Sequence, residues 1–127
     1  MLEETAAAIF ARHGLDFSTA RRASGWTNAT WLAGGLALRL STRPGNDSLR
    51  REARLAALLP SESGYPLLIE SGVTPDGLEW SLSAAVPGQS LGEAWPGLDW
   101  PARCAALRGL WQKMQAVHTV NPAAARG

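Results

Sequence analysis

The hydrophobic residues of this 127-residue chain follow two different patterns. Near both ends and again over residues 48–59, apolar residues recur every three or four positions, as in an amphipathic helix, whereas the other segments are short, as β-strands are. Gly34-Gly35 joins two such segments and predicts a tight hairpin, because glycine accepts positive φ angles. The pattern predicts an α+β fold with an antiparallel sheet of about five strands. The predicted helices cover residues 2–13, 48–59 and 99–118, and the predicted strands cover 21–24, 29–33, 36–41, 67–73 and 78–86.

The breaks between these elements carry capping and turn signals. Either Asn46 or Asp47 is placed to cap the helix over 48–59, and Asp99 is placed to cap the last helix. Residues 89–98 are expected to form a loose segment, and Asn121-Pro122 is expected to stop the last helix before a frayed end. The chain has the length of one domain, so one core is expected, and we find no internal repeat.

Two charged residues occupy positions where the hydrophobic pattern does not favour them. Arg39 projects from the middle of a predicted strand, on the same face as the small Ala37. Glu52 lies three residues from Leu49, within the apolar stripe of the predicted helix over 48–59. A carboxylate in an apolar stripe is costly unless it is paired, and a guanidinium is well suited to pair with it. The sequence therefore predicts an Arg39–Glu52 ion pair, with solvent exposure of both side chains as the alternative.

Composition narrows the possible functions. Twelve Lys and Arg against eleven Asp and Glu leave a net charge of +1, too little to form the basic surface that nucleic-acid binding needs. A single cysteine, Cys104, excludes an internal disulfide and fits a cytoplasmic protein. The acidic N-terminus is unlike a signal peptide, and no apolar stretch reaches the length of a membrane span. His13 and His118 lie far apart, and neither they nor Cys104 suggest a metal site or a catalytic residue.

A short turn carries several groups that could bind phosphate. Residues 24–30, Ser-Gly-Trp-Thr-Asn-Ala-Thr, join two predicted strands and supply a glycine, hydroxyls and an amide. Backbone N–H groups and short polar side chains in such a turn can point at phosphate oxygens. An ordinary turn has the same composition, so this signal is weak by itself.

Taken in order, these features resemble the N-terminal lobe of the aminoglycoside phosphotransferase and choline kinase family, which has a protein-kinase-like fold. The turn at Ser24, Gly25, Thr27 and Asn28 resembles the phosphate-covering loop of that family. Ala37-Leu38-Arg39 resembles the Ala-x-Lys of the third strand, with Arg39 in place of lysine, and Glu52 resembles the glutamate that holds this base. Residues 84–86, Ala84, Ala85 and Val86, precede Pro87-Gly88 and resemble the adenine-binding hinge.

The resemblance implies a particular domain organisation and ligand. It implies an N-terminal helix over 1–20, a nucleotide-binding lobe over 21–86, a hinge over 87–98 and the first helix of a second lobe over 99–127. ATP is the implied cofactor, and Mg²⁺ is expected only with the rest of the second lobe, which holds the His-x-Asp catalytic loop and the metal-binding Asp. This truncated lobe by itself is therefore expected to be inactive and to contain no catalytic residue.

Two functions remain open at this stage. In the first, the chain is the ATP-binding lobe of a kinase that phosphorylates a hydroxyl of an aminoglycoside-, choline- or thiamine-like molecule. In the second, it is a non-catalytic nucleotide-binding or interaction module that pairs with a separate second lobe. Self-association or docking of that lobe is expected through the C-terminal helix, where Leu107, Trp111 and Met114 form an apolar face.

Overall fold

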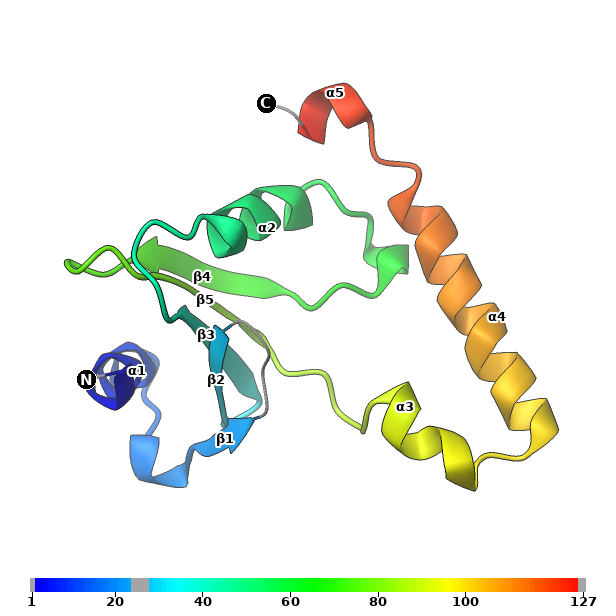
Figure 1. Cartoon of the computed structure of the whole chain (residues 1–127), viewed down its shortest axis with the longest axis horizontal. Helices are drawn as coiled ribbons and strands as arrows, with labels where there is room; N and C mark the ends of the chain where they lie inside the picture. The colour runs from blue at the N-terminus through cyan, green and yellow to red at the C-terminus, as the bar shows by residue number, and fades with distance from the viewer. Residues whose placement is uncertain (1, 24–27, 126–127) are drawn as a thin grey trace. The chain divides into compact units, whose positions relative to one another are not determined.

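The structure of the chain is a computed structural model that describes residues 2–23 and 28–125. Within these residues, the elements divide between two compact units (Figure 1). The first unit contains residues 1–54 and 66–86, and the second contains residues 55–65 and 87–127. In the described part of the chain, no helix is both long and apolar enough to cross a membrane.

The first unit is built on an antiparallel sheet. Its described strands are β1 (Arg21–Ala23), β2 (Asn28–Ala33), β3 (Leu36–Ser41), β4 (Leu68–Val73) and β5 (Glu79–Ala84). They follow the order β1-β2-β3-β5-β4, so β5 lies between β3 and β4. Gly34 and Gly35, both with positive φ, form the predicted hairpin between β2 and β3. The predicted α+β fold with a five-stranded antiparallel sheet is confirmed for the described residues.

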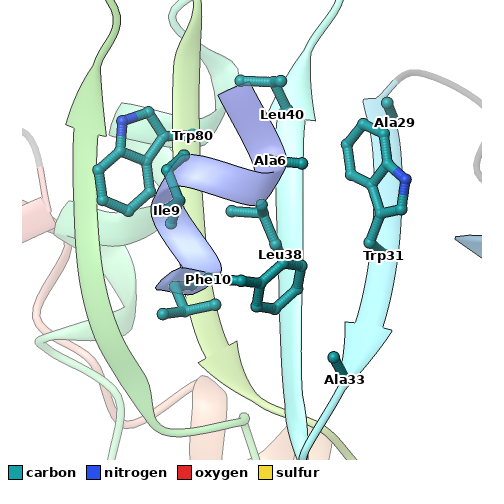
Figure 2. Close-up of a cluster of buried hydrophobic side chains, with 10 residues drawn as sticks. Ala6, Ile9, Phe10, Ala29, Trp31, Ala33, Leu38, Leu40 and Trp80 are labelled. Atoms are coloured by element: carbon teal, nitrogen blue, oxygen red, sulfur yellow. The ribbon is translucent and has the colours of Figure 1, made fainter. Parts of the chain in front are cut away.

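Helix α1 (Leu2–Arg12) covers the apolar face of this sheet. Ala6, Ile9 and Phe10 recur at helical spacing, and all three are buried. Figure 2 shows them against Leu38 and Leu40 of β3. The cluster also contains side chains from β2 and β5, namely Ala29, Trp31, Ala33, Trp80 and Leu82. Burial of this cluster removes apolar surface from water, which is the main force that holds α1 to the sheet.

Helix α2 (Ser48–Ala56) lies at the face of the sheet opposite α1. Its Glu52 forms an ion pair with Arg39 of β3, and its Arg50 forms one with Glu79 of β5. Asp47 O accepts a hydrogen bond from Arg51 N at 3.0 Å, so Asp47 occupies the N-cap position, and Asn46 Oδ1 accepts from Ser48 N, the first helical N–H, at 3.0 Å. The predicted helix was too long at its C-terminal end. Leu58 N and Leu59 N bond to carbonyl oxygens three residues earlier, and Pro60 disfavours helical backbone at the residue before it.

The second unit is formed by helices. Its elements are η2 (Ser61–Ser63), α3 (Leu91–Ala94), η3 (Trp95–Gly97), α4 (Trp100–Val117) and α5 (Pro122–Ala125). Asp99 Oδ1 accepts a hydrogen bond from Ala102 N at 2.9 Å, which confirms the predicted cap of α4. Arg103 of α4 donates from Nη2 to Trp95 O at 3.0 Å and lies over the Trp95 ring, so η3 is held to α4.

Two predictions for the second unit were wrong. The segment over 89–98 is not loose, because Ser90 Oγ accepts from Glu93 N and begins α3. Residues 123–125, expected to belong to a frayed end, instead form part of α5. Asn121 Oδ1 accepts from Ala123 N, and Pro122 takes the first position of α5, where its missing N–H costs nothing.

Candidate functional site

The face of the sheet opposite α1 carries a row of polar side chains. Register pairs Thr30 with Arg39, Arg39 with Ser81, and Ser81 with Ser71. Residues directly opposite one another on neighbouring strands point to the same face, so these four residues cross β2, β3, β5 and β4 on one side. Ser81 is only 3% exposed, and its Oγ makes no hydrogen bond to the described residues. The centre of this face is therefore polar, whereas the centre of the opposite face is occupied by the apolar core.

Arg39 and Glu52 meet on this polar face. Arg39 Nη2 lies 2.9 Å from Glu52 Oε1, which confirms the ion pair predicted from the sequence. The two side chains are 32% and 35% exposed, so both are reachable from solvent. An ion pair with this exposure contributes at most about 1 kcal/mol to stability. Glu52 is therefore not deeply buried, and its desolvation costs less than its place in an apolar stripe suggests.

A second carboxylate, absent from the sequence predictions, holds the start of α2. Glu79 begins β5, and its side chain is 8% exposed. Its Oε2 accepts a hydrogen bond from Arg50 N at 2.7 Å, and its Oε1 lies 3.7 Å from Arg50 Nε. The alternation of Glu79, Ser81 and Ser83 with apolar residues indicates that they share a face, but no sequence signal links Glu79 to Arg50.

A small cavity of about 160 Å³ lies beside this carboxylate. It is lined by Arg50, Ser71, Gly72, Val73, Glu79 and Trp80. This volume holds only a few water molecules, which occupy about 30 Å³ each in the liquid. The cavity is therefore too small for a nucleotide.

The residues of the predicted hinge lie at the end of β5 and directly after it. Ala84 N donates to Leu67 O at 2.8 Å, and Ala85 N donates to Gly35 O at 2.8 Å. Two N–H groups in the segment predicted to bind adenine are thus already used within the first unit. A purine would have to use the carbonyl oxygens of this segment or the N–H of Val86, which is 67% exposed.

The predicted phosphate-covering turn is described only at its end. Ser24, Gly25 and Thr27 lie outside the described residues. Asn28 is the first residue of β2 and pairs with Ser41, two residues from Arg39 on the same face of β3. Its Oδ1 is buried and has no hydrogen-bond partner among the described residues. Ala37 also lies on this face, opposite Ser83.

A cluster of charged and aromatic side chains was also missed by the sequence analysis. Glu70 of β4 forms an ion pair with Arg12 and accepts a hydrogen bond from His13 Nε2, with Oε2 at 2.7 Å. The hydrogen bond from His13, followed by the charge of Arg12, lowers the pKa of the Glu70 carboxyl against the opposing effect of desolvation. Arg12 also lies over the Trp80 ring, 5.7 Å from its centroid. These contacts hold the end of α1 to β4 and β5.

Metal-binding groups and nucleophiles contribute little to the candidate site. In the ranges 2–23 and 28–125, no three His, Cys, Asp or Glu side chains lie close enough together to hold a metal ion. Cys104 is half-buried on α4, and His118 forms the C-terminal cap of that helix. The candidate site is the polar face, with the Arg39–Glu52 ion pair and the buried oxygen atoms of Ser81 and Asn28.

Comparisons with family models, with curated proteins and with solved structures found no match to this chain.

Proposed function

We propose that this chain is the ATP-binding lobe of a small-molecule kinase that transfers the γ-phosphoryl group to a hydroxyl. In this proposal Arg39 neutralises the α- and β-phosphates, and Glu52 orients Arg39. The turn from Gly25 to Asn28 covers the phosphates, and residues 84–86 contact adenine. The acceptor is an aminoglycoside-, choline- or thiamine-like molecule, as the resemblance implies.

The Arg39–Glu52 ion pair is the observation that carries this proposal. Protein kinases require a base on the third strand of the sheet to pair with a glutamate on the following helix. Here Arg39 lies on the third strand, Glu52 lies on the next helix, and Nη2 and Oε1 are 2.9 Å apart. Arginine replaces the usual lysine. Its planar guanidinium can contact Glu52 and a phosphate with different N–H groups, so the substitution keeps both functions available.

Calorimetry with ATP and Mg²⁺ tests the proposal. We expect the wild-type chain to bind ATP, and Arg39→Ala and Glu52→Ala to weaken binding by roughly tenfold or more, since each ten-fold step corresponds to about 1.4 kcal/mol. Arg39→Lys should keep most of the affinity. Arg51→Ala is the matched control, because Arg51 lies on the same helix, is 73% exposed and pairs only loosely with Asp47, at 3.7 Å. Absence of ATP binding in the wild-type chain would contradict the proposal.

The chain by itself is expected to bind ATP without transferring its phosphoryl group. In the family that the sequence resembles, a His-x-Asp loop followed by Asn, and a later Asp, carry the transfer and hold Mg²⁺. No His-x-Asp occurs among the 127 residues. ATP-dependent phosphorylation of a small alcohol by the purified chain would contradict this part of the proposal.

A non-catalytic module that pairs with a separate second lobe is the other candidate function. The exposed apolar side chains of α4 favour it: Trp111 is 56% exposed, and Leu107 and Leu110 are each 49% exposed. Apolar patches of this kind mark interaction surfaces. Sedimentation at increasing concentration tests whether this face is an interaction surface: the wild-type chain should self-associate, and Trp111→Glu should suppress self-association and leave ATP binding unchanged.

A further inference from the structure

The short helix α2 depends on its surroundings for its position. It has nine residues, fewer than the roughly 12–15 that an isolated helix needs to be marginally stable in water. Leu49, 2% exposed, is the buried residue of α2. An apolar contact of this kind holds the helix to its neighbours but does not fix the direction of its axis or its rotation. Polar contacts at defined atoms are needed for that.

Glu79 supplies such a contact at the beginning of the helix. The first N–H groups of a helix have no partner within it, and the helix dipole favours a negative charge near them. Glu79 Oε2 accepts from Arg50 N at 2.7 Å, whereas the Oε1 contact with Arg50 Nε is longer, at 3.7 Å, and involves a side chain that is 62% exposed. The bond to the backbone is therefore the one that fixes the helix, because the guanidinium contact is longer than a hydrogen bond and the Arg50 side chain is largely exposed.

Arg39 and Glu79 project from the same face of the sheet. Arg39 is opposite Ser81, and Glu79 precedes Ser81 by two residues on β5. Glu52 follows Arg50 by two residues on α2. The helix is thus attached to two adjacent strands, by Glu79 to β5 and by Glu52 to β3. A shift of its first turn away from β5 would move Glu52 relative to Arg39.

We infer that Glu79 is a positioning residue for the Arg39–Glu52 pair. Its carboxylate holds the first turn of α2 to β5, and this keeps Glu52 Oε1 within reach of Arg39 Nη2. Glu79 itself does not contact the nucleotide. The consequence for nucleotide affinity rests on the proposed function, whereas the effect on the ion pair does not.

A double-mutant cycle measures this role. We expect Glu79→Ala to weaken ATP binding by about five- to tenfold in the wild-type background and to have no further effect in the Glu52→Ala background, because groups that act through one another are not additive. Glu79→Gln should keep most of the affinity, since its amide oxygen still accepts from Arg50 N. Asp76→Ala, which removes an exposed carboxylate from the same hairpin, is the control. Equal weakening by Glu79→Ala in both backgrounds, or no weakening in either, would overturn the inference.

A second measurement does not require nucleotide. The NMR signal of Arg39 Nε–H reports the surroundings of its guanidinium. In Glu79→Ala, we expect the chemical shift of this signal to equal its value in Glu52→Ala, because the ion pair is lost in both variants. In Glu79→Gln, we expect the chemical shift to stay near its wild-type value. A wild-type position in Glu79→Ala would overturn the positioning role. If the wild-type chain binds no ATP, the proposed function fails, and this signal still decides the role of Glu79.

Discussion

Gly72 of β4 lies so close to the buried Trp80 side chain that a larger residue does not fit there. It pairs with Trp80, and a Cβ added to it would lie 2.9 Å from Cζ2 of the indole. Trp80 is 6% exposed, so its ring cannot move aside without disturbing its neighbours. We expect Gly72→Ala to lower the free energy of unfolding by about 1–3 kcal/mol, as overpacked cores do. Urea unfolding measures this, with Gly109→Ala on α4 as the control, because a Cβ there meets nothing within 4 Å.

Glu70 makes stability depend on pH in a defined direction. The hydrogen bond from His13, with the charge of Arg12, lowers the pKa of its carboxyl in the folded chain. A group whose pKa is lowered by folding stabilises the protein above its unfolded pKa, and this contribution is lost as the pH falls through the folded pKa. The difference in unfolding free energy between wild type and Glu70→Gln should therefore be present at about pH 5 and shrink towards about pH 3. A difference that grows as the pH falls would contradict this assignment.

Helix α1 is the element on which the core of the first unit most depends. Phe10 is fully buried, and its ring lies 6.3 Å from that of Phe17, which in turn lies 6.2 Å from the ring of Trp31. Truncation of such a residue removes apolar contact and leaves a cavity. We expect Phe10→Ala to cost about 3–5 kcal/mol in urea unfolding. Phe10→Leu, which keeps most of the volume, should cost clearly less, and equal costs for the two variants would argue against close packing of α1.

The cap of α4 has a smaller and more local effect. Asp99 Oδ1 satisfies one N–H group in the first turn, and its charge is favourable near the helix N-terminus. Asp99→Ala should cost about 1 kcal/mol of helix stability, whereas Asp99→Ser should cost less, because serine also caps. Amide hydrogen exchange in the first turn of α4 measures the effect. Unchanged exchange in Asp99→Ala would show that other contacts hold this end of the helix.

Turn and capping residues in the sequence predicted the helices and strands well. Contacts between residues far apart in the sequence were harder to predict. The Gly34-Gly35 hairpin and the Asp99 cap each depend on residues within a few positions, which the sequence displays directly. The Arg39–Glu52 pair could be predicted because both charges interrupt an apolar pattern. Glu79 interrupts no pattern, and its partner Arg50 precedes it by 29 residues. The insertion of β5 between β3 and β4 and the pairing of Glu70 with His13 likewise depend on tertiary structure alone.

At the scale of the whole molecule, the buried apolar residues are unequally divided between the two units. In the part of the chain that the structure describes, every buried hydrophobic residue belongs to the first unit, from Ala6 on α1 to Leu82 on β5. The 18 residues of α4 include none that is buried. Hydrophobic burial is the dominant stabilising force in folding, so the first unit should be much the more stable of the two.

The rates of amide hydrogen exchange should therefore differ between the two units. Amides of β3 and β5 are expected to exchange only through unfolding of the sheet, since their partners lie on neighbouring strands around Leu38 and Leu82. Amides of α4 should exchange much faster, because opening this helix exposes little further apolar surface. Binding of a second lobe over Trp111 would slow exchange in α4 and leave β3 unchanged. Equal protection of α4 and β3 in the isolated chain would show that the apolar face of α4 is already covered, and this would argue against α4 as a docking surface.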